Sequence, residues 1–128
     1  MIYLDTSVAL AHLLAEDRLP PASLWRQSLV SSRLLEYELW TRIHGTGLAH
    51  SHGEDARTLL SRVAFLELTP VVLARALEPF PVPVRTLDAL HLASIEFLRS
   101  QRVNVELASY DDRLVVAARR LQVAIAAA

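Results

Sequence analysis

The chain alternates short apolar runs with segments whose apolar residues recur at helical spacing, and this alternation restricts the folds it can adopt. Five of the runs are typical of buried strands, at residues 2–4, 29–31, 65–68, 105–108 and 123–125. Helices are predicted from Pro20-Pro21 onward and over 6–15, 33–44, 54–63, 71–77, 86–100 and 111–121. Strands that alternate with helices form a parallel sheet covered on both faces. We therefore expect an α/β fold, a three-layer α/β/α sandwich around a parallel sheet of four to five strands.

Length and composition place this chain among ordinary globular domains. Its 128 residues are 52% apolar and 21% charged, which predicts a single domain over 1–128 with a substantial core. No apolar run approaches the roughly 18 residues of a membrane span, and no basic-then-apolar signal segment opens the chain. We expect a cytoplasmic protein with no membrane partner.

Three aspartates stand where an apolar strand should pass into a helix. Asp5 follows the first strand, Asp88 lies at the start of the predicted helix 86–100, and Asp111 follows the strand 105–108. In an open α/β sheet, ligands bind in the crevice at the carboxyl ends of the strands. Carboxylates gathered there repel one another unless a divalent cation lies between them. The pattern therefore favours metal-dependent chemistry.

Each aspartate also has a purely structural interpretation. Asp5 and Asp111 suit the N-cap position of the helices that follow them, and Asp88 suits the first turn of its helix, where the helix dipole favours negative charge. The hydroxyl of Thr6 has the same two interpretations, as a capping group or as a group that holds a water molecule or a phosphate oxygen. Taken together, the three acids favour the site.

A fourth carboxylate comes from the helix predicted at 33–44. Glu36 and Glu38 point about 200° apart on a helix, so only one of them faces the crevice. Glu38 lies one turn after the apolar Leu34 and Leu35, which favours Glu38. An ordinary surface glutamate remains the alternative.

The residue types limit the chemistry further. Oxygen ligands without any cysteine suit Mg²⁺ or Mn²⁺ better than zinc, and His50 and His52 are expected in a solvated turn. His91 is expected to bond a backbone carbonyl within its helix. All thirteen basic residues are arginine, so mechanisms that need a lysine are excluded. These include receiver domains, haloacid-dehalogenase phosphatases and P-loop enzymes.

Four segments resemble the motifs of the PIN domain family. They are Leu4-Asp5-Thr6-Ser7, the segment 32–39 that carries Glu36 and Glu38, Leu87-Asp88-Ala89-Leu90-His91 and Ser109-Tyr110-Asp111-Asp112. Their order and spacing extend across nearly the whole chain. A compact PIN domain without appendages most resembles the VapC toxins of bacterial toxin–antitoxin pairs. The family often has a glycine near the end of its last helix, where this chain has Arg120-Leu121-Gln122, so the position of the last strand stays open.

The resemblance implies a Mg²⁺- or Mn²⁺-dependent endoribonuclease toxin that cleaves RNA, forms a homodimer and is inhibited by a cognate VapB-like antitoxin. Carried over to this chain, the metal-binding and catalytic acids are Asp5, Glu38, Asp88 and Asp111, and Thr6 orients the attacking water. Arg85 and Arg113 are candidates for contacts with the RNA backbone. The non-enzymatic alternative is a catalytically silent PIN-like module for protein interaction or regulation.

Overall fold

The computed structural model describes all 128 residues and contains five strands, six α-helices and one short 3₁₀ helix. In chain order, the elements are β1 (Ile2–Leu4), α1 (Thr6–Leu13), η1 (Ala22–Arg26), β2 (Leu29–Ser32), α2 (Leu34–Gly45), α3 (Ala49–Ser61), β3 (Val63–Leu66), α4 (Pro70–Ala76), α5 (Thr86–Ser100), β4 (Glu106–Ala108), α6 (Asp112–Arg120) and β5 (Ala124–Ile125).

The five strands form one sheet in the order β3-β2-β1-β4-β5, and every pairing is parallel. The first strand lies at the centre, where Leu4 pairs with Ala108 of β4 and Tyr3 pairs with Val30 of β2. Because the strands are parallel, their carboxyl ends meet at one edge of the sheet. The predicted parallel sheet is confirmed.

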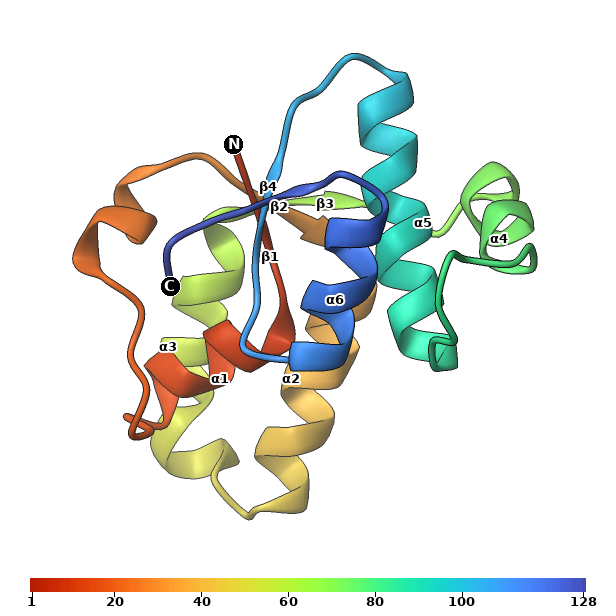
Figure 1. The fold of residues 1–128 in the computed structure, drawn as a ribbon. Helices are drawn as coiled ribbons and strands as arrows, with labels where there is room; N and C mark the ends of the chain where they lie inside the picture. The colour runs from red at the N-terminus through yellow and green to blue at the C-terminus, as the bar shows by residue number, and fades with distance from the viewer.

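Helices cover both faces of the sheet, as Figure 1 shows. Alternate side chains of β1 enter opposite cores: Ile2 and Leu4 pack with residues of α1, α2 and α3, whereas Tyr3 packs with residues of α5 and α6. Helix α4 lies outside the second layer and packs against α5. The predicted three-layer sandwich is therefore also confirmed.

Several predicted boundaries were wrong. The helix predicted from Pro20-Pro21 is only the five-residue 3₁₀ helix η1, because Leu29 is needed in the sheet, where it pairs with Ile2. Helix α3 begins at Ala49, so His50 and His52 lie in its first turn and not in a loop. Its Gly53 is buried against the ring of Trp40, a packing contact that overrides the low helix propensity of glycine.

Two strand boundaries also differ: β3 lies two residues earlier than predicted, and β4 begins one residue later. Strand β3 begins at Val63 and β4 begins at Glu106, because pairing with the neighbouring strands sets where each ends. The expected last strand is present at Ala124–Ile125 and pairs with β4.

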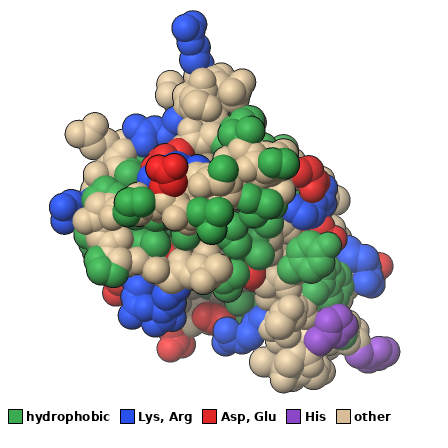
Figure 2. All heavy atoms as spheres, turned by 90° about the vertical axis from the view of Figure 1, so that its right-hand side faces the viewer, with side chains coloured by type: hydrophobic (Ala, Val, Ile, Leu, Met, Phe, Trp, Pro, Cys, Tyr) green, Lys and Arg blue, Asp and Glu red, His purple; other side chains and the backbone are tan.

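One face of the protein is strongly apolar. Figure 2 shows hydrophobic side chains gathered on the side that carries α4. On this helix and just after it, Val71, Leu73 and Leu77 are exposed, and Leu77 retains 90% of its accessible surface. A hollow of about 710 Å³ lies beside them, between α4, the proline-rich segment 78–84 and the start of α5.

No helix is both long enough and apolar enough to cross a membrane.

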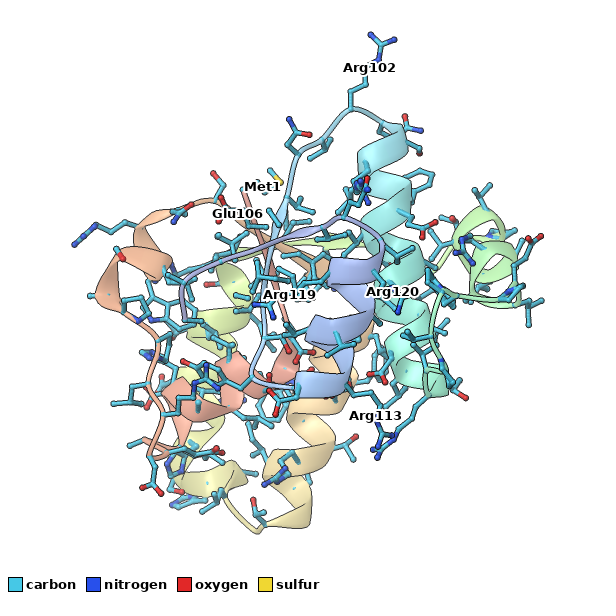
Figure 3. The ribbon with its side chains drawn as sticks, viewed as in Figure 1. Met1, Arg102, Glu106, Arg113, Arg119 and Arg120 are labelled. Atoms are coloured by element: carbon cyan, nitrogen blue, oxygen red, sulfur yellow. The ribbon has the colours of Figure 1, made fainter.

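Three helices are followed by a left-handed residue that is not glycine, and after α1 this residue is Ala15, with φ of 49°. Arg102 after α5 and Gln122 after α6 both have φ of 62°. After α5 and α6, the amide of the left-handed residue and the next amide both bond back to the last turn, as in a Schellman motif: Val123 N–H, for example, donates to the carbonyl of Ala118 at 3.0 Å. Figure 3 shows Arg102 pointing away from the protein. At Arg102 and Gln122 the left-handed backbone is therefore strained, because the Cβ atom clashes with the backbone in this conformation.

Replacing either residue with glycine is expected to raise the free energy of unfolding by about 1 kcal/mol, since glycine adopts this conformation without a Cβ clash. Urea denaturation of Arg102→Gly and Gln122→Gly measures the change. The matched control, Arg119→Gly within α6, is expected to lower stability by about 1 kcal/mol. Lower stability in both cap variants would contradict this account of the helix ends.

Candidate active site

The carboxyl edge of the sheet forms a polar pocket of about 500 Å³. Four elements contribute acids to it: the end of β1, helix α2, the first turn of α5 and the end of β4. The lining residues that carry a carboxylate are Asp5, Glu38, Asp88 and Asp111. All four acids predicted from the sequence therefore share one pocket.

Asp5 is buried and is fixed by two serines. Its Oδ2 accepts hydrogen bonds from Ser7 Oγ at 2.6 Å and from Ser109 Oγ at 2.8 Å. The same serines accept the backbone N–H groups of Tyr110 and Asp111. Although Asp5 occupies the N-cap position of α1, its side chain caps no amide there. The capping interpretation of Asp5 is therefore wrong, and its carboxylate is fixed across the β1–β4 junction.

Asp88 is buried, and its Oδ2 accepts the N–H of Arg85 at 3.3 Å. Arg85, not Thr86 as its sequence position suggests, is the N-cap of α5. Burial raises the pKa of Asp88, and the negative charges of Asp111 and Asp5 raise it further. The charge on this carboxylate is therefore unfavourable in the folded protein.

Asp111 serves as a helix cap and also lines the pocket. Its Oδ1 accepts the N–H groups of Arg113 and Leu114 at 3.0 and 3.3 Å, which makes it the N-cap of α6. The structural interpretation of this residue is correct, but it does not exclude the functional one. Arg113 itself does not line the pocket and extends from the first turn of α6 (Figure 3).

The two glutamates of α2 have different surroundings. Glu38 lines the pocket, and its Oε1 accepts a hydrogen bond from Thr6 Oγ1 at 3.0 Å. Glu36 forms an ion pair with Arg33 at 2.8 Å, and Arg33 also pairs with Glu67 at 2.7 Å. Glu36 is thus held on the outer surface, and Glu38 faces the pocket.

His91 differs from the sequence expectation. Its ring is buried and bonds two side chains, not a backbone carbonyl: Nε2 lies 2.6 Å from Glu38 Oε1 and Nδ1 lies 2.8 Å from the Tyr3 hydroxyl. Burial alone would lower the pKa of His91, but the hydrogen bond and charge of Glu38, with the charges of Asp5 and Asp88, outweigh it and raise that pKa. The one indication in the sequence that His91 faces the pocket was its position three residues, about one helical turn, after Asp88.

Two arginines also line the pocket, Arg85 and Arg42. Neither forms an ion pair with the carboxylates around them. Arg42 was missed in the sequence, although it lies four residues after Glu38 and therefore on the same face of α2. These two cations line an acidic pocket, and each could bind a phosphate group of a ligand.

The donor set suits a hard divalent cation, since it consists of carboxylate oxygens with no thiolate. No three acidic or histidine side chains already lie close enough to form a coordination shell. Like-charge repulsion favours this spacing. Asp5 Oδ2 and Glu38 Oε1 each already accept two hydrogen bonds. The residues fit a cation that draws them together.

The raised pKa of Asp88 leads to a prediction for the metal-free protein. Asp88→Asn removes an unfavourable charge while the amide oxygen can still accept the Arg85 N–H, so its melting temperature in EDTA is expected to exceed that of the unchanged protein. With free Mn²⁺ at 100 times its Kd, the unchanged protein should gain about 2.7 kcal/mol, and Asp88→Asn much less. Glu54→Gln, on the exposed face of α3, is the matched control and should behave like the unchanged protein.

The pH dependence of stability in EDTA provides a second measurement. A raised native pKa means that the folded state binds a proton more tightly, so stability should rise as the pH falls through the native pKa of Asp88 toward the lower pKa of the unfolded chain. Asp88→Asn should flatten this slope. An unchanged slope would show that the pKa of Asp88 is not raised in the folded protein.

Comparison with known proteins finds similarity over most of the chain. The family model of the PIN domain matches residues 2–120. The chain is 33% identical over 132 residues to Ribonuclease VapC46 of Mycobacterium tuberculosis (strain ATCC 25618 / H37Rv), with 98% of this chain and 96% of that protein covered. The crystal structure of M. tuberculosis VapC20, a sarcin–ricin loop cleaving toxin, superposes with a TM-score of 0.66 at 19% identity and covers 91% of this chain and 95% of that one. The chain belongs to the PIN domain family.

Proposed function

We propose that this chain is a divalent-metal-dependent endoribonuclease, the toxin of a toxin–antitoxin pair. The single observation that carries the proposal is the pocket in which Asp5, Glu38, Asp88 and Asp111 meet. The relative named as a ribonuclease aligns with nearly the whole chain, which supports RNA as the substrate.

The four carboxylates would hold Mg²⁺ or Mn²⁺. The bound ion would supply Lewis-acid chemistry, activating water for attack on phosphorus and neutralising charge on the scissile phosphate. Asp5 and Glu38 enter this role with orientations already fixed by hydrogen bonds. Thr6 donates to Glu38, and its oxygen retains lone pairs that can orient a water molecule. Hydrolysis would then proceed by in-line attack of that water, without a covalent enzyme intermediate.

RNA must approach this pocket against the repulsion of four acids. Arg42 and Arg85, at the pocket wall, are the side chains placed to bind its phosphates, because a guanidinium matches phosphate geometry. Without a cation, RNA binding should therefore be weak.

A groove beside the pocket suits the cognate antitoxin. It is lined by residues of α1 and α2, among them Tyr37 and Thr41, and it shares Thr6, Glu38 and Arg42 with the acidic pocket. Tyr37 is exposed here, as is Leu87. An antitoxin segment that packs on these apolar side chains would place an arginine among the acids and exclude RNA. The exposed apolar face of α4 is in turn the surface that we assign to a homodimer.

The two glutamates of α2 provide a matched test of the catalytic proposal. Glu38→Gln is expected to lower Mn²⁺-dependent cleavage of a fluorogenic RNA by at least about 100-fold, since metal-site substitutions cost this much or more. Glu36→Gln makes the same chemical change two residues away and should retain activity within about threefold. Equal activity in both variants would contradict the assignment of Glu38. A well-folded, Mn²⁺-bound protein that cleaves no RNA would instead favour the catalytically silent module.

The arginines are tested by the salt dependence of RNA binding. Each phosphate contact with single-stranded RNA contributes about 0.7 to the slope of log K against log salt. Arg42→Ala and Arg85→Ala are each expected to reduce the slope by roughly this amount, measured by anisotropy with a non-cleavable RNA and Mn²⁺ present. Arg119→Ala, on the outer surface of α6, should leave the slope unchanged. Unchanged slopes in both pocket variants would place the RNA elsewhere.

A further inference from the structure

A continuous set of hydrogen bonds connects the pocket to the interior of the sheet. Glu38 Oε1 is 2.6 Å from His91 Nε2, and His91 Nδ1 is 2.8 Å from the hydroxyl of Tyr3. The backbone N–H of Ser32 donates to the same hydroxyl at 3.2 Å. The chain of contacts thus joins α2, α5, β1 and the end of β2.

The direction of these hydrogen bonds is largely determined. Tyr3 accepts from Ser32, so its own hydrogen is free for His91 Nδ1. The ring then carries a hydrogen on Nε2 and donates it to Glu38. An imidazolium would also donate from Nε2. In either form, His91 presents an N–H to the carboxylate.

His91 and Tyr3 are both fixed by packing. The exposed fraction is 2% for His91 and 0% for Tyr3, and their rings meet edge to face with centroids 5.8 Å apart. The T-shaped contact and the buried surroundings leave His91 no alternative partner in solvent. It therefore defines the position of whatever bonds its Nε2.

The consequence falls on Glu38, whose long side chain is otherwise free to change rotamer. Its Oε1 accepts from His91 and from Thr6, which leaves Oε2 as the oxygen with no protein partner. Asp5 shows the same device, since its Oδ2 is held by Ser7 and Ser109. In both residues one oxygen is fixed by donors and the other is left for a ligand.

We propose that His91, backed by Tyr3, is a positioning residue that fixes the Glu38 carboxylate for binding the catalytic cation. The proposal deepens the proposed function and rests on it. It assigns His91 no contact with RNA and no part in proton transfer. Partners of metal-binding carboxylates act in this way by holding their orientation.

The test compares Mn²⁺ binding by calorimetry in the full chain and in two variants at His91. His91→Leu fills the buried position with an apolar side chain and removes the N–H that bonds Glu38. It is expected to raise the Kd for Mn²⁺ by about 10- to 100-fold. His91→Gln retains an N–H donor and should restore Kd to within about fivefold of the unchanged protein. The KM for RNA at saturating Mn²⁺ should be the same in all of them.

Two outcomes would overturn the proposal: an unchanged Kd for Mn²⁺ in His91→Leu, or a loss in His91→Gln as large as in His91→Leu. If His91→Leu does not fold, Tyr3→Phe decides, because it removes the backing hydroxyl and keeps the ring. We expect a weakening of about threefold or more in Tyr3→Phe, and an unchanged Kd would contradict the proposal.

Glu38→Gln separates this inference from the proposed function. If the unchanged protein binds Mn²⁺ and Glu38→Gln loses that binding, the proposed metal site stands and the His91 variants alone decide. If Glu38→Gln binds Mn²⁺ as tightly as the unchanged protein, the proposed site itself fails, and the role of His91 in it fails with it.

Discussion

The parallel pairing of β1 with β4 is the constraint on which the pocket depends. The register places Leu4 beside Ala108, so the residues that follow the two strands begin at the same level of the sheet. Asp5 N–H donates to the carbonyl of Ala108, and its carboxylate accepts from Ser109. Two segments more than a hundred residues apart are thereby held together. A shift of one residue in this register would turn the acid toward the opposite face.

The acids that meet at this edge are held against their mutual repulsion. Asp5 receives two serine hydroxyls, Glu38 receives a threonine hydroxyl and a histidine N–H, and Asp111 receives two helix amides. Asp88 accepts only one long hydrogen bond, from the backbone N–H of Arg85, and its pKa is raised. The fold thus pre-orients the carboxylates with hydrogen-bond donors and leaves the remaining negative charge to be balanced by a ligand. This arrangement is less stable than a neutral pocket would be, which is typical of functional sites.

The sequence predicted the layers of the fold, the parallel sheet and the four acids that share the pocket. These features follow from local patterns: apolar runs specify strands, Asp5 and Asp111 stand between a strand and a helix, and Asp88 and Glu38 stand on helices that begin near the same edge of the sheet. The short connection at η1 and the helical position of Gly53 were not predictable in this way, because pairing with β1 and packing on Trp40 decide them. The partners of His91 were also hidden, since Tyr3 and Glu38 lie 88 and 53 residues away in the chain. Such contacts exist only once the strands and helices have assembled.

Anomalous scattering from a crystal grown with Mn²⁺ tests the central claim most directly. The account predicts a manganese peak within coordination distance of carboxylate oxygens from Asp5, Glu38, Asp88 and Asp111, with those side chains drawn together around it. A peak elsewhere on the protein, with these four carboxylates as far apart as they are in this structure, would contradict it.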